Sequence, residues 1–151
     1  YKVLKEVIDE SSKKVLIFVP FKHVINMLVD KLSVDGITSE IIRGDVSAPK
    51  RTEIFNRFQT MDDPKVLVIQ PQAAAHGVTL TAANTVVWWG PTSSLETYLQ
   101  ANARVHRAGQ DHKCTVVQLQ SSDVEKRIYS LLDNRINIHT RIIDLYKDLL
   151  D

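Results

Sequence analysis

The sequence of 151 residues predicts an α/β domain of three layers, in which a parallel sheet of five or six strands is covered by helices on both faces. Short apolar runs, such as residues 15–19, alternate along the chain with longer segments whose apolar residues recur at helical spacing. The runs are continuous, which is typical of parallel strands buried on both faces. A composition of 44% hydrophobic and 25% charged residues fits one compact core. We therefore expect residues 1–151 to form a single domain.

Alternating helices and strands account for the first half of the chain. The first strand ends at Pro20, the helix after it ends before Gly36, and Ser47 caps the next helix. The predicted elements are a short amphipathic helix at 2–9, a strand at 14–19, a helix at 21–34, a strand at 38–42, a helix from 47 to about 58 and a strand at 66–69. Because the strands alternate with helices, we expect them to run parallel with right-handed crossovers.

The second half of the chain continues the alternation after a long loop. Its predicted elements are a loop at 70–83, a strand at 85–89, a helix that Ser94 caps and that carries residues 100–110, a strand at 115–119 and a long helix that Asp123 caps and that reaches about residue 149. In sheets of this kind, ligands meet the loops beyond the carboxyl ends of the strands. A functional site is therefore expected on those loops.

The composition narrows the classes of function. A net charge of +1 does not exclude nucleic acid as a partner, since binding needs only a local basic surface. No apolar stretch is long enough to span a bilayer and no signal-peptide pattern opens the chain, so we expect a soluble protein with no membrane partner. The lone cysteine, Cys114, excludes an internal disulfide and a cysteine metal cluster. We expect it to be a buried small hydrophobe in a reducing, cytosol-like compartment.

Residues 100–110 carry the most informative pattern of the chain. Gln100, Arg104 and Arg107 fall within about 60° of arc, on one face of one helix that stops at Gly109. A guanidinium is always charged and offers a rigid fork of donors that matches phosphate geometry. Two of them on one face indicate a phosphate partner or buried carboxylates. By themselves, the same residues also fit a solvated helix face with surface ion pairs.

These residues resemble the sixth conserved motif of superfamily 2 helicases, in the form ending in Gly-Gln that marks the SWI/SNF-related DNA translocases. Residues 66–83, with His-Gly-Val-Thr-Leu-Thr at 76–81, resemble the fifth motif of that family. The pattern at residues 88–96 is similar to its phage and prophage branch. The two motifs stand in the right order at the right separation, and the resemblance covers the chain from Lys14 to about Tyr129.

The resemblance implies the second RecA-like lobe of a two-lobed motor that binds ATP in the cleft between its lobes. Arg107 matches the arginine finger, which stabilises the charge on the transferring γ-phosphoryl group. Arg104 matches a companion arginine that contacts phosphate or first-lobe carboxylates, and Gln100 matches a glutamine that helps to seal the cleft. We expect both guanidinium groups to point outward from the rim of the lobe. Gly77 and Val78 are expected beside the nucleotide.

The resemblance also implies a surface that follows a nucleic-acid backbone. Thr79 and Thr81 match hydroxyl donors to phosphate, and Lys22, Arg43 and Gly44 match positions near the other backbone-contacting loops. We expect these residues to follow one strand of duplex DNA without reading its bases. The sequence departs from many family members where it has Pro-Phe after the first strand and three alanines in the fifth motif.

The cofactor implied by the resemblance is ATP with Mg²⁺, held mainly by an N-terminal RecA-like lobe of the same polypeptide. The 151 residues contain no Gly-x-x-x-x-Gly-Lys-Ser/Thr loop and no Asp-Glu-x-His box to hold a triphosphate and its metal. We therefore expect this chain alone to hydrolyse almost no ATP. The complete DNA-dependent ATPase is expected in the cytoplasm of a bacterial or phage-infected cell, or in the nucleus of a eukaryote.

Four other residues have simpler interpretations. His106 points about 100° away from either arginine and is expected to pack or to lie at the surface, and His76 has no carboxylate partner at a sensible spacing. Trp88 and Trp89 suggest base stacking. Adjacent strand residues face opposite sides of a sheet, so we expect at least one tryptophan to pack in the core.

Two other functions fit the same residues. An RNA helicase lobe would share the fold, but the commoner RNA-helicase motif ends in Gly-Arg, whereas this chain has Gly109 followed by Gln110. A non-catalytic nucleic-acid-binding or regulatory module would keep the fold without motor activity. The joint presence of Gln100, Arg104 and Arg107 argues against such a loss.

Overall fold

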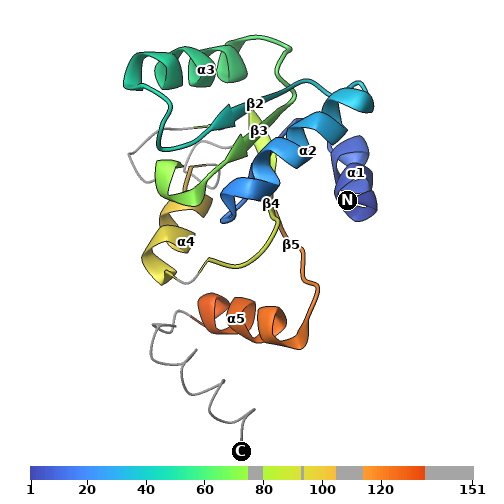
Figure 1. Cartoon of the computed structure of the whole chain (residues 1–151), viewed down its shortest axis with the longest axis vertical. Helices are drawn as coiled ribbons and strands as arrows, with labels where there is room; N and C mark the ends of the chain where they lie inside the picture. The colour runs from blue at the N-terminus through green and yellow to red at the C-terminus, as the bar shows by residue number, and fades with distance from the viewer. Residues whose placement is uncertain (75–79, 93, 105–113, 135–151) are drawn as a thin grey trace, which may run out of the picture.

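The computed structural model describes residues 1–74, 80–92, 94–104 and 114–134. The elements of these residues, shown in Figure 1, are α1 (Lys2–Glu10), β1 (Lys14–Phe18), α2 (Lys22–Val34), β2 (Ser39–Ile42), α3 (Ala48–Thr60), β3 (Val66–Ile69), the 3-10 turn η1 (Pro71–Ala74), β4 (Ala83–Trp88), α4 (Leu95–Asn102), β5 (Thr115–Gln118) and α5 (Asp123–Asp133). All of the predicted strands are confirmed, with small shifts at their ends.

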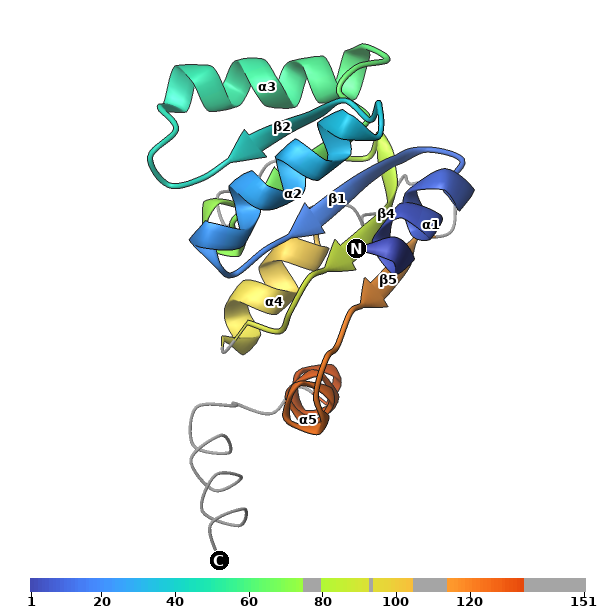
Figure 2. The same ribbon diagram turned by 45° about the vertical axis from the view of Figure 1, so that its right-hand side comes forward.

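The strands form one parallel sheet in the order β2-β3-β1-β4-β5. β1 lies at its centre, where Ile17 pairs with Val68 of β3 and with Val87 of β4. In Figure 2 the strand arrows point toward the same end of the sheet. We call this end, where the carboxyl ends of the strands meet, the carboxyl edge, and the opposite end the amino edge.

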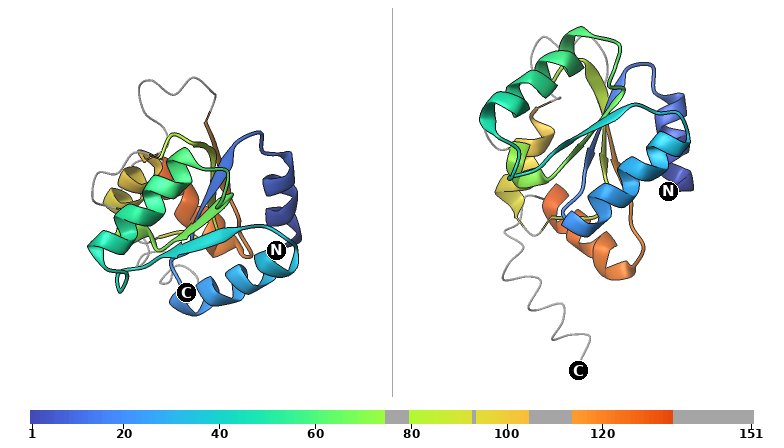
Figure 3. Two further views of the ribbon diagram at one scale, coloured as in Figure 1. Left: turned by 90° about the horizontal axis from the view of Figure 1, so that it is seen from above. Right: turned by 45° about the horizontal axis from the view of Figure 1, so that its top comes forward.

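Helices cover both faces of the sheet (Figure 3). Val15 and Ile17 of β1 belong to a core cluster with residues of α1 and α2, whereas Leu16 and Phe18 belong to a cluster with residues of α3, α4 and α5. All four side chains are fully buried. Neighbouring residues of a strand point to opposite faces, so a strand covered on both sides must be apolar throughout. The predicted three-layer α/β class is therefore confirmed.

Local hydrogen bonds set the ends of the helices. Gly36, with a φ of +76°, ends α2, and its N–H and that of the next residue donate to carbonyl groups of the last turn. Ser47 and Ser94 cap α3 and α4 as predicted, since each hydroxyl accepts a backbone N–H of the first turn. The cap of α5 is Ser122, and the prediction of Asp123 is wrong by one residue. Asp123 is instead the first helical residue, where its negative charge interacts favourably with the helix dipole.

α5 is shorter than the sequence predicts. One helix is expected from residue 123 to about 149, but α5 ends at Asp133. The backbone N–H and the side-chain amide of Asn134 both donate to the carbonyl of Ser130, which satisfies the last turn of the helix. Residues 135–151 lie outside the described residues.

Two further expectations are adjusted by the structure. Residues 71–74, predicted in a loop, form the turn η1 directly after β3. Cys114, predicted as a buried strand residue, lies just before β5 and is only partly buried, because β5 is an edge strand of the described sheet. No helix in the described ranges is both long and apolar enough to cross a bilayer.

A buried tyrosine joins α5 to the carboxyl edge. Tyr129 is 2% exposed, and its hydroxyl donates to the carbonyl of Leu119 at 2.9 Å and lies 3.3 Å from the carbonyl of Trp88. Burial raises the pKa of Tyr129 well above its ordinary value, and the carboxylate of Glu125 raises it further. A phenolate could donate neither hydrogen bond, so this contact requires the neutral side chain.

We expect Tyr129→Phe to remove part of the alkaline destabilisation of the protein. Below about pH 10 the folded and unfolded chains both hold the phenol proton. Above it the unfolded chain releases the proton while the folded chain keeps it, so the free energy of unfolding of the wild type falls as pH rises. Urea unfolding should show the variant less stable by about 0.5–1.5 kcal/mol at neutral pH. It should also show a smaller loss than the wild type at about pH 10.5. An equal loss in both proteins would contradict this assignment.

Candidate functional site

One group of predicted site residues lies at the carboxyl edge. Lys22 begins α2 shortly after β1, and Arg43 and Gly44 follow β2. Lys22 is exposed, and Asn26, one helical turn further along α2, accepts a hydrogen bond from Nη1 of Arg43 at 3.5 Å. The structure therefore places Lys22 and Arg43 close together, although they belong to different parts of the chain.

A glutamine that the sequence did not single out holds the turn after β2. Oε1 of Gln70, directly after β3, accepts the backbone N–H of Gly44 at 3.3 Å, and the backbone N–H of Gln70 donates to Ile42 at 2.9 Å. Nε of Arg43 lies 3.3 Å from the carboxylate of Asp45, which is 71% exposed. A pair this exposed is weak, so a phosphate can compete for Arg43. The feature that could have indicated Gln70 is its position directly after β3, the strand that pairs with β2.

A second group of predicted site residues lies at the end of α4. The prediction that one continuous helix carries Gln100 and Arg104 is wrong, because α4 ends at Asn102. Arg107 lies outside the described residues. Arg104 is 7% exposed, and its Nε donates to the carbonyl of Gln100 at 2.8 Å. The expectation that Arg104 points outward from the rim is therefore wrong too. Its side chain instead closes the last turn of α4.

Tertiary hydrogen bonds explain why α4 ends early. Oδ1 of Asn102 accepts the indole N–H of Trp88 at 2.9 Å. The carbonyl of Arg104 accepts the backbone N–H of Leu80 at 2.8 Å, whereas in a continuing helix it would bond to a residue four positions later. Helical periodicity could not reveal this competition, because both partners come from β4 and the segment before it.

Thr81 lies at the amino edge, away from Lys22 and Arg43. Its hydroxyl lies 3.3 Å from Nε2 of Gln59 and accepts a hydrogen bond from it, and its carbonyl accepts from Nζ of Lys13 at 3.1 Å. The resemblance groups Thr81 with Lys22 and Arg43 on one backbone-binding surface, but the structure places Thr81 at the opposite edge of the sheet. Its role at a phosphate stays a prediction.

Gln100 is partly buried, and its side-chain amide donates to Glu96 at 3.2 Å, one turn earlier on α4. The other predicted site residues lie outside the described residues, and their roles stay predictions. They are Gly77, Val78, Thr79 and Arg107, together with the histidines His76 and His106.

The two tryptophans face opposite sides of the sheet. Trp88 is fully buried, with ring centroids 4.8 Å from Phe18 and 4.9 Å from Tyr98. Trp89 is partly buried and packs against the cluster on the α1 and α2 side. The expectation that at least one tryptophan belongs to the core is confirmed, and burial leaves Trp88 unable to stack on a base.

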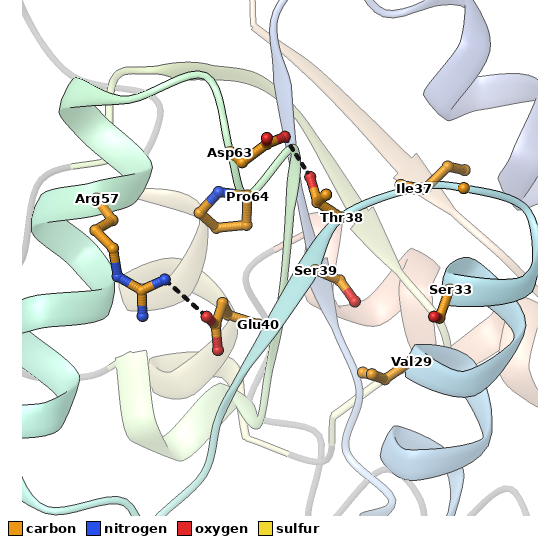
Figure 4. Close-up of a pocket in the computed structure, with 10 residues that line it drawn as sticks. Val29, Ser33, Ile37, Thr38, Ser39, Glu40, Arg57, Asp63 and Pro64 are labelled. Carbon is orange, nitrogen blue, oxygen red and sulfur yellow. Dashed lines mark hydrogen bonds and ion pairs between the residues drawn. The ribbon is translucent and has the colours of Figure 1, made fainter.

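A pocket of about 500 Å³ lies beside the edge strand β2 (Figure 4). Four of its polar side chains form two pairs: Nη1 of Arg57 donates to Glu40 at 2.8 Å, and the hydroxyl of Thr38 donates to Asp63 at 2.8 Å. None of the predicted site residues that the structure describes lines it. We therefore assign the candidate site to the carboxyl edge and the end of α4.

Comparison with known proteins identifies the family. Residues 1–109 match the family described as helicase conserved C-terminal domain. The chain is 28% identical over 149 residues to the CHD3-type chromatin-remodeling factor CHR7 of Arabidopsis thaliana, covering 95% of this chain and 12% of that protein. It is 32% identical over 124 residues to an ATP-dependent helicase of Mycoplasma pneumoniae, covering 79% of this chain and 12% of that protein. A crystal structure of the C-terminal part of the Fun30 ATPase domain has a TM-score of 0.80 and 25% identity, over 87% of this chain and 44% of that chain.

The chain belongs to the helicase conserved C-terminal domain family. The similarity to the Fun30 structure confirms the RecA-like fold, and with the other relatives it confirms the relation to SWI/SNF-type helicases. The chain spans only 12% to 15% of the length of the curated relatives that it matches. What a complete protein of this kind binds and does is therefore taken up as a proposal.

We expect Arg104→Met to lower the free energy of unfolding by about 1–3 kcal/mol, because it leaves the carbonyl of the partly buried Gln100 without its side-chain donor. Arg127→Met is the matched control, since Arg127 is exposed on α5 and its loss should stay within about 0.5 kcal/mol. Urea unfolding of both variants measures the difference. Equal effects would show that Arg104 does not support the fold.

Proposed function

We propose that this chain is the C-terminal half of an ATP-dependent DNA helicase or translocase. In this role it supplies the arginine finger and part of the surface that binds the DNA backbone. The observation that carries the proposal is the family match over residues 1–109, which includes the whole Gln-x-x-x-Arg-x-x-Arg pattern of residues 100–107. The complete protein is a DNA-dependent ATPase, and residues 1–151 are a single domain of it with almost no ATPase activity of their own.

ATP with Mg²⁺ is the proposed cofactor, held mainly by an N-terminal RecA-like lobe of the same polypeptide. In the described residues, the carboxyl edge offers the cations Lys22 and Arg43, which suit phosphate better than a metal ion. Arg107 places its guanidinium on the γ-phosphate, where it stabilises charge during transfer. Arg104, which is buried, supports Arg107 by holding the end of α4.

The other nucleotide contacts are carried over from the family pattern. Gly77 and Val78 approach the nucleotide, and Gln100 helps to seal the cleft. Gln100 fits this task because its backbone carbonyl is fixed by Arg104 while its side chain donates to Glu96 on the helix surface. Closure of the cleft then depends on bound nucleotide.

The DNA backbone is proposed to cross the carboxyl edge. Lys22 lies at the N-terminus of a 13-residue helix, where backbone N–H groups and the helix dipole both favour an anion. Arg43 and the amide of Gly44 lie beside it on the turn that Gln70 holds. Thr79 is proposed to extend this contact as a hydroxyl donor, and Thr81, which lies at the amino edge, is proposed to make a separate phosphate contact. Such contacts fix the position of the protein on DNA, probing its backbone and not its bases.

Two alternatives are separated by nucleic-acid-stimulated ATPase assays of the complete protein. An RNA helicase would be stimulated by RNA in preference to duplex DNA, and a non-catalytic binding module would hydrolyse no ATP under any condition. A phage or prophage origin is supported only by the pattern at residues 88–96, since the relatives described above come from a plant and a mycoplasma. The proposed location is the cytoplasm if the protein is bacterial or comes from a phage, and the nucleus if it is eukaryotic.

We expect Arg107→Ala in the complete protein to reduce the DNA-stimulated turnover of ATP by about 10³ while leaving DNA affinity nearly unchanged, because the residue acts at the phosphoryl group. Arg127→Ala removes an exposed arginine of α5 and should leave turnover unchanged. Steady-state ATPase assays and DNA-binding titrations measure the two effects. Near-normal turnover of Arg107→Ala would remove the arginine-finger assignment.

We expect Lys22→Ala to weaken DNA binding and to lower the slope of log affinity against log salt by about 1, which corresponds to one phosphate contact. Lys2→Ala is the control, because Lys2 is also an exposed lysine at a helix start but lies on α1. Titrations at several salt concentrations provide the slopes. Identical slopes for Lys22→Ala and the wild type would exclude the contact.

A further inference from the structure

Three separate parts of the chain meet at residues 80–82, which lead into β4 at the amino edge. Leu80 is fully buried, and its backbone N–H donates to the carbonyl of Arg104 at 2.8 Å. The carbonyl of Thr81 accepts from Nζ of Lys13 at 3.1 Å, and the backbone N–H of Ala82 donates to Oε1 of Gln59 at 2.8 Å. We call residues 80–82 the β4 anchor.

Gln59 holds the β4 anchor with both ends of its side-chain amide. Oε1 accepts the backbone N–H of Ala82, while Nε2 donates to the hydroxyl of Thr81 at 3.3 Å. An amide is suited to this pair of bonds because it carries an acceptor and a donor side by side. Gln59 is partly buried, so water competes only in part for these partners.

The position of Gln59 is itself fixed by the start of the central strand. Nζ of Lys14 donates to the carbonyl of Phe58 at 2.7 Å and also to the carbonyl of Met61, and it lies 4.9 Å from the centroid of the Phe58 ring. Burial lowers the pKa of Lys14, against the opposing effect of the carboxylates of Asp62 and Asp63. The last turn of α3 is thus bonded to β1, and these bonds fix the position of Gln59.

We infer that Gln59 is a positioning residue that couples DNA binding to ATP turnover. The inference rests on the proposed function, in which the fifth motif contacts DNA and the sixth contacts ATP. The β4 anchor lies at the end of the fifth motif and is bonded through Leu80 to Arg104 in the sixth. Gln59 holds this anchor against the core, so a displacement on one side is transmitted to the other. Thr81 then serves the fold through Gln59 as well as any contact with phosphate.

The test compares Gln59→Met and Gln59→Glu in the complete protein. Methionine keeps the length of the side chain but has no donor and only a weak acceptor, so both bonds are lost. Glutamate still accepts the N–H of Ala82, and the hydroxyl of Thr81 can rotate to donate to its second oxygen. Gln120→Met is the control for an exposed glutamine beyond β5.

We expect Gln59→Met to reduce DNA-stimulated turnover about fivefold or more. Turnover without DNA and the affinity for DNA should stay within about twofold of the wild type, and Gln59→Glu and Gln120→Met should both retain stimulation. Hydrogen exchange should become faster at Ala82 in Gln59→Met alone. A purely structural role would lower turnover with and without DNA together. That result, or loss of stimulation in Gln59→Glu equal to that in Gln59→Met, would overturn the inference.

Failure of the proposed function is recognised separately. If the wild-type protein shows no ATP turnover with DNA, the proposed motor function is wrong and the coupling role falls with it. Hydrogen exchange at Ala82 still reports whether Gln59 holds the β4 anchor. Unchanged exchange in Gln59→Met, in a protein whose turnover does respond to DNA, overturns the assignment of Gln59 alone.

Discussion

The structure depends on a central strand that is buried from every side. β1 is paired with β3 and β4, and its side chains are packed by helices on both faces, so residues 15–19 are fully buried. Continuous apolar character there leaves no surface for a functional side chain. Chemistry is therefore confined to the two ends of the strands, where the chain turns into helices. Among the described candidate residues, Lys22, Arg43, Gly44 and Thr81 lie near strand ends, as that constraint requires.

The lysines at the amino edge donate hydrogen bonds to the protein's own backbone. Nζ of Lys65 donates to the carbonyl of Lys13 at 2.6 Å, Nζ of Lys13 to that of Thr81, and Nζ of Lys14 to that of Phe58. Such bonds satisfy carbonyl groups of turns that strand pairing does not reach. These ammonium groups already donate to backbone carbonyls. The carboxyl edge, where Lys22 and Arg43 lie, is therefore the better surface for a nucleic-acid backbone.

The two arginines of the sixth motif are not equivalent supports for the proposed chemistry. Arg104 is buried and bonded to Gln100, and its carbonyl fixes Leu80, so its contribution is to the shape of the lobe. The proposal for Arg107 therefore does not require two guanidinium groups that both point outward. It depends on the single guanidinium of Arg107, which follows Arg104 in the sequence. Arg104 is bonded through its carbonyl to Leu80 of the β4 anchor, which Gln59 holds through Ala82.

The sequence by itself determined the layers, the strands and the identity of the motifs, because alternation of continuous apolar runs with helical stripes is a local property that neighbouring residues carry. It also indicated Lys22 and Arg43, which follow strand ends. The early end of α4, the burial of Arg104, and the contacts of Asn26, Gln59 and Gln70 were decided only by tertiary structure. Each depends on a hydrogen bond between residues distant in the sequence, such as Arg104 with Leu80, and such a bond overrides local helical preference only once the strands have paired.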